Sequence, residues 1–398
     1  MFLNWRRSFA ACAFLALISS AAIADEPLPP DSLIGYTRFR VNLPSGRHAN
    51  AATMRAHVVR VDGHGTRELA VDLTAKPDTW TQFAGWSPDG QTAAIGCGWE
   101  DPENARWEEE HKTFRFTTGG WLYDVHMLDL VTGKAVNVTA VDRVSDYNTG
   151  VFFWPNDPEH LGFQALIDGI SHPYRMDRDG RNKVDLRSGA DGFTYGFNAS
   201  SDGKRIAYHK NYQVYLADAD GKNAEQVETG NPFNFAPSWS PDGTHIVFVS
   251  GEHYDCHPHI VHRDGSALQK IGDRGGYRGV VTIFDVFDFH GGSSDLPVWT
   301  PDSRSLIYAR QLGEGTSSLL SSLAGHNEQL TRSAPGSLNY HPQVHPGGEW
   351  IVFGSNRTGT RQLYVLHLAT GKTHAVTEVP GGNGAMWPHW QPRPPITR

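Results

Sequence analysis

The sequence predicts an all-β protein folded as a seven-bladed β-propeller, and three observations support this. First, a turn phrase recurs at Gly85–Gly90 (GWSPDG), Ser238–Gly243 (SWSPDG) and Val298–Ser303 (VWTPDS). Second, an apolar run follows each phrase, as in 244–250 (THIVFVS). Third, weaker copies at 153–157, 198–203 and 344–348 extend the series at roughly 40- to 60-residue intervals, which is typical of propeller blades.

Each repeat is expected to form four antiparallel strands. The Pro and Asp-Gly of the turn phrase favour a tight turn between the first two strands. A second hairpin, such as the one at Thr370-Gly371-Lys372, joins the last two. Inner strands are therefore expected to begin near Phe83, Thr149, Tyr195, Phe235, Asp295 and Tyr340.

The two ends of the chain are expected to share the remaining blade. Segment 386–390 (MWPHW) matches the inner-strand starts at 236–239 and 296–299, but little sequence follows it. Segments 34–41, 55–61 and 66–73 supply three strands that have no inner partner. The C-terminal strand should therefore close the first blade and complete a ring of seven.

The N-terminus resembles an export signal. Arg6 and Arg7 precede an apolar stretch at 9–23, and Ala22-Ile23-Ala24 predicts a signal peptide over residues 1–24, cleaved after Ala24. Residues 25–398 are then expected to form a single propeller domain in the periplasm or outside the cell. The formal net charge of -8, with no basic block, predicts neither nucleic-acid binding nor membrane insertion. Cys97 and Cys256 fall in distant blades, so both are expected to be thiols.

One face of the ring carries the unusual residues. Loops that enter the inner strands, and loops between the second and third strands, should emerge on one face, here named the top face; the other is the bottom face. Polar, titratable and aromatic residues collect in these top-face loops, as in a polar ligand pocket. The glutamates at 108–110 are expected in a solvated turn or helix, or else at the site. Candidate substrate-binding residues are His48, Asn50, Asn148, His209, Tyr212 and His389.

A divalent metal, Mn, Ca or Zn, is a candidate cofactor. His257 and His259 alternate on an extended segment with Asp255 and so point the same way, although an exposed strand face would explain the same pattern. His341 and Asp295, on neighbouring inner strands, form a second candidate set. The sequence has no Gly-x-Ser-x-Gly motif, so a serine hydrolase is not expected.

The repeats carry a family resemblance. The Trp-Ser-Pro-Asp-Gly phrase followed by Ile-Val-Phe-x-Ser, together with 353–359 (FGSNRTG) followed by Leu363-Tyr364, closely resembles the TolB-like (WD-like PD-repeat) propeller family. The resemblance covers roughly residues 79–392 and implies the propeller fold. The N-terminal α/β domain with which the TolB translocation protein binds partners has no counterpart in this sequence.

The repeats resemble the oligogalacturonate lyase family more distantly. That family's seven-bladed propeller holds a divalent metal and performs β-elimination on a uronate. Tyr340-His341-Pro342 resembles its metal-binding His-Pro. Its other histidine positions fall on Asn339, Leu296 and Ala236, so the resemblance implies a related lyase rather than the same specificity.

The leading functional prediction is a periplasmic polysaccharide lyase that acts on a uronate-containing oligo- or polysaccharide. β-Elimination requires a cation beside the carboxylate, a base and an acid. Candidates for these roles are Arg278 or Arg357, His290 or His257, and Tyr147 or Tyr340, with His341, Asp295 and His259 as candidate metal ligands. The alternative is a non-catalytic envelope propeller that recognises a protein or glycan with the same face.

Overall fold

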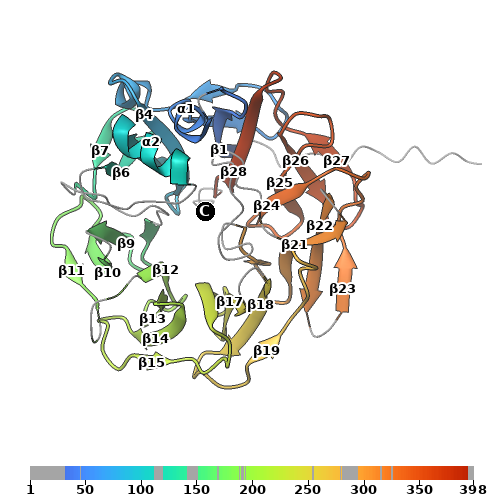
Figure 1. The fold of residues 1–398 in the computed structure, drawn as a ribbon. Coiled ribbons are helices and arrows are strands. Elements are labelled where there is room, and N and C mark those ends of the chain that lie inside the picture. The colour runs from blue at the N-terminus through green and yellow to red at the C-terminus, as the bar shows by residue number, and fades with distance from the viewer. Residues whose placement is uncertain are drawn as a thin grey trace, which may run out of the picture.

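The computed structural model describes residues 32–44, 46–111, 120–140, 151–167, 170–187, 189, 192, 194–252, 255–277, 279, 295–313, 316–323 and 326–392. These residues form seven four-stranded sheets arranged as a ring (Figure 1), so the predicted seven-bladed propeller is confirmed. All ladders within the sheets are antiparallel, as hairpin-connected strands require.

Blades 1 to 4 occupy the first half of the ring. Blade 1 contains β28 (Asn383–Trp390), β1 (Leu33–Arg40), β2 (Arg55–Arg60) and β3 (Arg67–Glu68). Blade 2 contains β4 (Thr79–Trp86), β5 (Thr92–Glu100), β6 (Trp121–Asp129) and β7 (Ala135–Asn137). Blade 3 contains β8 (Phe152–Phe153), β9 (His160–Ile167), β10 (Ile170–Asp177) and β11 (Val184–Asp185). Blade 4 contains β12 (Thr194–Ala199), β13 (Arg205–Lys210), β14 (Gln213–Asp218) and β15 (Glu225–Gln226).

Blades 5 to 7 complete it. Blade 5 contains β16 (Phe233–Trp239), β17 (His245–Glu252), β18 (Asp255–His262) and β19 (Gln269–Lys270). Blade 6 contains β20 (Val298–Trp299), β21 (Leu306–Gly313), β22 (Thr316–Leu323) and β23 (His326–Gln329). Blade 7 contains β24 (Asn339–Val344), β25 (Trp350–Ser355), β26 (Gln362–His367) and β27 (Thr373–Ala375).

The C-terminal strand closes the ring, as the sequence predicted. β28 pairs antiparallel with β1, so the red and blue ends of the chain lie side by side in Figure 1. Apolar residues of this blade, including Ile34 and Trp390, pack in one cluster with Val352 and Val365 of blade 7. Because this cluster spans two blades, closure buries apolar surface as well as pairing strands.

The bottom-face turns are built from local hydrogen bonds. Ser240 Oγ donates to Asp242 Oδ1 at 2.6 Å and accepts from the amide of His245 at 3.0 Å. Ser87, Ser200 and Thr300 occupy the equivalent position with the same pattern. The hydrogen bonds from Ser200 and Thr300 are the main reason that the pKa values of Asp202 and Asp302 lie below the usual value.

Two expected elements differ from the structure. Segment 66–73 was expected to be a strand, but only Arg67–Glu68 pairs, because Ala70 adopts a left-handed φ of 51° and the chain turns into a 3₁₀-helix, η1 (Val71–Thr74). The loop at 46–50 instead forms a short helix, α1 (Gly46–Ala51). The insertion after Trp99 contains a second helix, α2 (Pro102–His111), one of the two forms predicted for it.

The two cysteines of the described residues are both thiols, as predicted. Cys97 lies on β5 of blade 2 and Cys256 on β18 of blade 5. Among the described residues, no helix is both long enough and apolar enough to cross a bilayer. The signal-peptide prediction for residues 1–24 lies outside the described residues.

Candidate functional site at the top face

A pair of helices stands on the top face over blades 1 and 2 (Figure 1). α1 connects β1 to β2, and α2 connects β5 to β6. Asp101 caps α2, since its Oδ1 accepts the amides of Glu103 at 2.8 Å and Asn104 at 3.1 Å. Gly46 has a φ of 72°, and a Cβ there would lie 2.6 Å from Glu109 Oε1, so the two helices are in close contact.

A buried polar cluster attaches α2 to the propeller. Asn104 Nδ2 donates to Glu100 Oε1 at 3.2 Å and to Glu108 Oε1 at 3.1 Å, and Trp121 Nε1 donates to Glu108 Oε1 at 3.0 Å. Glu100 is 0% exposed and Glu108 2% exposed. His48 of α1 joins the cluster, with its Nδ1 3.2 Å from Glu100 Oε2. Glu108 is therefore a buried anchor and is not solvated as its sequence context suggested.

Blades 5, 6 and 7 are joined by a second buried polar network. Tyr277 Oη donates to Asp295 Oδ2 at 2.6 Å, and the amide of His341 donates to Asp295 Oδ1 at 3.0 Å. Arg274, which is 1% exposed, donates to the carbonyls of Ala309 and Asp295 at 3.2 and 2.9 Å. Burial, with the negative charge of Asp295, raises the pKa of Tyr277 well above its usual value.

Inner strands β24 and β28 carry a line of stacked rings. His341 and Trp387 stack with their ring centroids 5.8 Å apart, and Trp387 also stacks on Phe39 at 6.1 Å. His341 and Trp387 have left-handed φ values of 49° and 51°, and both lie in irregular parts of their strands' registers. The inner-strand bulges of blades 5 and 4 have the same left-handed backbone at Ala236 and Gly196, with φ values of 46° and 69°, so this conformation belongs to the repeat.

His389 lies on β28 in the same wall. Burial, followed by the charge of His341, lowers the pKa of His389 to about 4, so its imidazole is neutral at pH 7. Its backbone carbonyl accepts the indole N–H of Trp86 in blade 2 at 3.0 Å. The residue predicted to bind substrate therefore also joins blade 1 to blade 2.

Two predicted histidines lie away from the inner strands. His257 and His259 are on β18, the third strand of blade 5, and both are buried rather than on an exposed strand face. His257 Nδ1 accepts the amide of Arg274 at 3.2 Å, while its Nε2 lies 3.3 Å from Asp255. Burial is the main cause that lowers the pKa of both histidines. Their ring nitrogens support the blade 5 framework.

Three further predicted residues are enclosed by the fold. Tyr340 is 0% exposed, and burial raises the pKa of its phenol. Asn50 is buried, and its Oδ1 accepts the amide of Leu43 at 3.1 Å. His209 is buried on β13 and packs edge-on against Phe235 at 5.6 Å. None of these three side chains is positioned to contact a ligand in the described structure.

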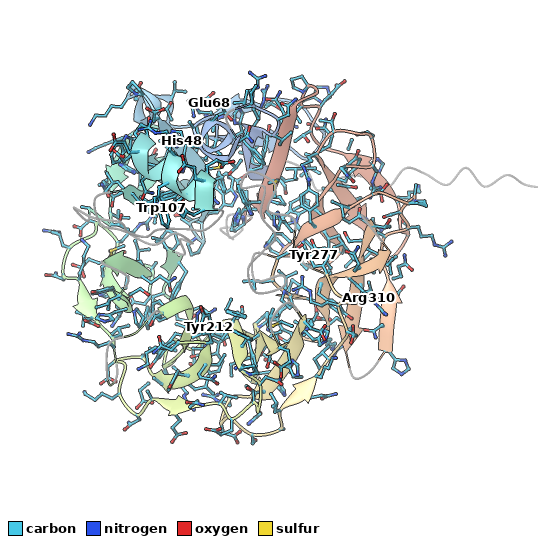
Figure 2. All side chains as sticks on the ribbon, viewed as in Figure 1. His48, Glu68, Trp107, Tyr212, Tyr277 and Arg310 are labelled. Carbon is cyan, nitrogen blue, oxygen red and sulfur yellow. The ribbon has the colours of Figure 1, made fainter. Side chains whose placement is uncertain are left out.

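The remaining described candidates lie on the top face. Figure 2 shows His48 at the helical pair and Tyr212 at the inner edge of blade 4. Arg357, in the turn from β25 to β26, donates to Asn339 Oδ1 at 3.0 Å and lies over the Tyr364 ring at 4.5 Å. Burial lowers its pKa from the usual arginine value. The candidates Tyr147, Asn148, Arg278 and His290 lie outside the described residues.

The described residues do not form the predicted metal site. No three His, Cys, Asp or Glu side chains of the described ranges gather as ligands. Asp295 reaches His341 through the backbone amide, and both of its carboxylate oxygens already accept hydrogen bonds. Asn339, Leu296 and Ala236 stand at the other positions that the lyase resemblance implied. The donor set therefore does not fit that family's metal.

Several top-face features were not predicted from the sequence. Trp107 and His111 of α2 stack at 4.1 Å with an interplanar angle of 15°. Tyr212 has a φ of 64° directly after Asn211 at 50°, so an aromatic residue occupies a hairpin turn that favours Asn-Gly. The hydrogen-bonded network of Arg274 had no local signal. The buried face of α2, formed by Asn104, Ala105 and Glu108, had no signal in the sequence either.

Comparison with known proteins supports the repeat assignment. Residues 209–395 match the model of the TolB β-propeller domain, PD40. The Tol-Pal system protein TolB of Bordetella pertussis is 30% identical over 171 residues, which cover 42% of this chain and 35% of that protein. An uncharacterized Agrobacterium fabrum protein matches over 53% of its own length, so this chain spans about a third to a half of these curated relatives.

Solved structures show the same fold. TolB from Acinetobacter baumannii aligns with a TM-score of 0.51 at 14% identity, covering 91% of this chain and 67% of that one. An oligogalacturonate lyase in complex with manganese aligns with a TM-score of 0.55 at 17% identity, covering 82% and 84%. These findings show that the chain is a seven-bladed β-propeller whose residues 209–395 match the TolB β-propeller domain.

Proposed function

We propose that this chain is a TolB-like propeller of the bacterial periplasm that binds a partner on its top face without catalysing a reaction. The observation that carries the proposal is where the structure places the predicted catalytic and metal-ligating residues that it describes. His257, His259 and Tyr340 are buried in the framework, and Asp295 has both carboxylate oxygens occupied. An active site requires groups that converge on one reacting position with free donors or acceptors. The described residues supply no such set.

The top face offers the features of a recognition surface. The only α-helices in the described ranges, α1 and α2, form a platform that presents the stacked Trp107 and His111. Across the ring, Tyr212 stands at the inner edge of blade 4 beside Phe233, at 5.4 Å between ring centroids. Aromatic side chains supply large contact area with few rotatable bonds, and they are enriched at protein interfaces.

Tyr212 is the sharpest single indication of binding. A left-handed φ costs an aromatic residue of the order of 1 kcal/mol, and glycine would remove this cost. The turn is nevertheless held, because the amide and the side-chain nitrogen of Asn234 both donate to the Tyr212 carbonyl, at 3.1 and 3.0 Å. Part of the ring packs against Phe233 and Phe235, and its half-exposed remainder is available to a partner.

The periplasmic location and the partner class rest on the relatives. The matched proteins bear the name Tol-Pal system protein TolB, which supports an envelope protein, and the predicted signal peptide agrees with it. A protein or a glycan is the proposed partner. The lyase prediction is supported only by a distant structural similarity to an oligogalacturonate lyase.

Site-specific photocrosslinking in the envelope of the native bacterium tests the proposal. A benzophenone amino acid would replace Trp107 or Tyr212 on the top face, and Lys222 in the β14–β15 turn of the bottom face would serve as the matched control. The expected result is a discrete adduct from both top-face positions and none from position 222. Tyr212→Gly should reduce the Trp107 adduct, with at most a modest fall in the melting temperature from the packing lost against Phe233 and Phe235.

A parallel activity assay separates the two functional classes. The purified protein would be incubated with uronate polysaccharides, with and without Mn, Ca or Zn, and the unsaturated product followed by its ultraviolet absorbance. No product is expected. Formation of product, or equal crosslinking from both faces, would contradict a top-face binding protein.

A further inference from the structure

Two histidines face each other on the bottom side of blade 5. His245 begins β17 and His262 ends β18, and the two residues lie directly opposite in the antiparallel ladder. Their rings pack edge to face, with centroids 5.6 Å apart and an interplanar angle of 79°. Val247 and Ile260, two residues further along each strand, share their side and pack with Leu306 of blade 6. The histidine pair therefore lies at the bottom edge of the interface between blades 5 and 6, where both side chains are partly exposed.

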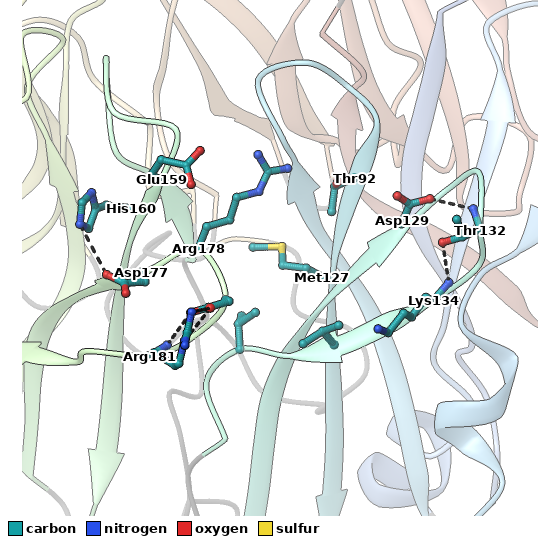
Figure 3. A pocket seen from close by; sticks show the side chains of 13 residues that line it. Thr92, Met127, Asp129, Thr132, Lys134, Glu159, His160, Asp177, Arg178 and Arg181 are labelled. Carbon is teal, nitrogen blue, oxygen red and sulfur yellow. Dashed lines mark hydrogen bonds and ion pairs between the residues drawn. The ribbon is translucent and has the colours of Figure 1, made fainter.

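Two other blades place a base opposite an acid at the same cross-strand position. His160 is opposite Asp177 in blade 3, and Arg205 is opposite Asp218 in blade 4. Figure 3 shows the contact in blade 3, where His160 Nε2 lies 3.6 Å from Asp177 Oδ1. Opposite charges favour such a cross-strand pair, whereas two imidazoles repel each other once both are protonated. An ion pair therefore does not account for the two histidines of blade 5.

Hydrogen bonding places the proton of His245 on Nδ1. This nitrogen lies 2.8 Å from Thr244 Oγ1. The Thr244 hydroxyl donates its only proton to Asp242 Oδ1, at 2.8 Å, so Oγ1 accepts from the histidine. In the neutral ring, Nε2 therefore carries the lone pair.

His262 has the same arrangement. Its Nδ1 lies 2.8 Å from Asp264 Oδ1. Hydrogen bonds from the Ser266 hydroxyl and from His262 hold the pKa of Asp264 below its usual value, so this oxygen is a carboxylate acceptor. Nδ1 is again the donor, and Nε2 carries the lone pair in the neutral ring. Among the described residues, no hydrogen bond or ion pair involves Nε2 of either His245 or His262.

The spacing of the two rings suits one shared metal ion. With zinc–nitrogen bonds of about 2.1 Å, two imidazoles on a tetrahedral ion have ring centroids about 5 Å apart, close to the observed 5.6 Å. Histidines that bind metals usually donate their other ring nitrogen to a carboxylate or a similar acceptor, which orients the ring and raises its basicity. Asp264 supplies such an acceptor directly, and Thr244 supplies one that Asp242 polarises.

The charged groups around the pair are consistent with a bound cation. Asp242 and Asp264 stand behind the two rings. Arg263, the residue after His262, is directed to blade 4, where it pairs with Asp202 at 3.7 Å.

We propose that His245 and His262 together bind one divalent transition-metal ion through their Nε2 atoms. Imidazole is a preferred ligand of zinc, copper and nickel, whereas magnesium and calcium prefer oxygen ligands. The described residues supply no third ligand here, so water fills the remaining positions. Copper should bind more tightly than nickel or zinc, in the usual order for nitrogen ligands. The site is on the bottom face and is independent of the partner proposed for the top face.

Calorimetric titration of the purified protein, produced without a histidine tag, tests this inference. Cu²⁺ and Zn²⁺ would be titrated separately at neutral pH, with Mg²⁺ as the ion that should not bind. His245→Gln and His262→Gln should each weaken the first Cu²⁺ site at least about tenfold. Electron paramagnetic resonance of the first Cu²⁺ equivalent should show two equatorial nitrogen ligands. Zn²⁺ should raise the melting temperature of the unmodified protein but not of the two variants, because the pair forms only in the folded hairpin.

The chain offers matched controls for position and for folding. His160→Gln changes the equivalent histidine of blade 3, whose two nitrogens already face aspartates, and His326→Gln changes an exposed histidine of β23. Both variants should retain the first Cu²⁺ site. Circular dichroism would confirm that all variants fold. Top-face crosslinking from position 107 should be unchanged in His245→Gln, which keeps this test separate from that of the proposed function.

Three results would overturn the inference. One is equal Cu²⁺ affinity of the unmodified protein and a variant that lacks both histidines; another is a first Cu²⁺ site with a single nitrogen ligand; the third is no binding of Cu²⁺ or Zn²⁺. The nitrogen count requires no substitution, so it decides the question even where a variant folds poorly.

Discussion

The two faces of this propeller are held together by different kinds of hydrogen bond. On the bottom face, Ser240 satisfies its turn with partners no more than five residues away. On the top face, Asp295 is bonded to Tyr277 and to the amide of His341, the latter 46 residues distant. The bottom turns therefore close on local hydrogen bonds and meet their neighbours through single contacts, such as that of the Asp242 amide with Ser303 Oγ at 3.0 Å. The top-face network instead consists of buried charged and polar groups that only the closed ring brings together.

The largest expected effect comes from Arg274 on the top side. Arg274→Leu leaves the buried carbonyls of Ala309 and Asp295 without their donor and should lower the free energy of unfolding by about 3 kcal/mol. Chemical denaturation would measure it. Arg181→Leu, on an exposed bottom-face turn, is the matched control and should change stability far less. Equal losses would contradict the difference between the faces.

The buried anchor of α2 should produce a smaller and more local loss. Glu108→Leu removes the acceptor of Asn104 and Trp121 and should cost about 2 kcal/mol, mainly by undocking α2. Trypsin cleavage at Arg106 should accelerate, while denaturation of the remaining blades changes little. Glu108→Gln keeps one acceptor oxygen and should lie between the two. Unchanged cleavage in Glu108→Leu would show that α2 is held by other contacts.

The bottom turns should lose stability in equal and additive steps. Ser87, Ser200 and Ser240 are each at most 1% exposed and accept backbone amides. Each substitution to alanine should cost about 1 kcal/mol, and the triple variant should cost close to the sum, although the turns of Ser200 and Ser240 belong to neighbouring blades and lie in contact. A triple variant that departs from the sum by more than about 0.5 kcal/mol would show that the turns are coupled across the ring.

Whether a feature depends on residues close together in the chain decides whether the sequence could predict it. The seven blades, the closing strand and the bottom turns were all predicted, because each depends on residues close together in the chain or on a repeated phrase. The burial of Glu108 could not be predicted, because its hydrogen-bond partner Trp121 lies on the far side of an insertion in the sequence. The positions of His257 and His259 were also misjudged, because alternation on a strand fixes a shared side but not whether the neighbouring blade covers it.

The candidate site was harder to predict for the same reason. Arg357, His48 and Tyr212 were predicted on the top face, where the structure has them. Tyr340 and Asn50 were also predicted as site residues, but the fold encloses both.

Acid should destabilise the ring through buried and half-buried histidines whose pKa values are lowered in the fold. Burial is the main cause that lowers the pKa values of His57, His126, His257, His259 and His389, to about 4 for His389. Below the unfolded value of 6.5, the unfolded chain therefore binds more protons than the folded one. This stability is complete above pH 6.5 and is lost as pH falls towards 4. The melting temperature should fall from pH 7 to pH 4.5, and less steeply in His389→Gln; a rise would contradict the assignment.

The smallest expected effect concerns blade 3, whose bottom face differs from those of blades 2 and 7 at the residue after the third strand. The residue after the third strand is Arg178 in blade 3, where blades 2 and 7 have Leu130 and Leu368. Arg178→Leu should raise the free energy of unfolding by less than about 1 kcal/mol, because Met127 and Val138 are already buried. Arg263→Leu should bring no such gain, because it also breaks the pair with Asp202. A stability gain would show that an apolar residue at this position packs in blade 3 as Leu130 and Leu368 do in their own blades. A stability loss would mean instead that Arg178, through its contact with Phe153, supports blade 3, and the two faces would then differ less than the turns suggest.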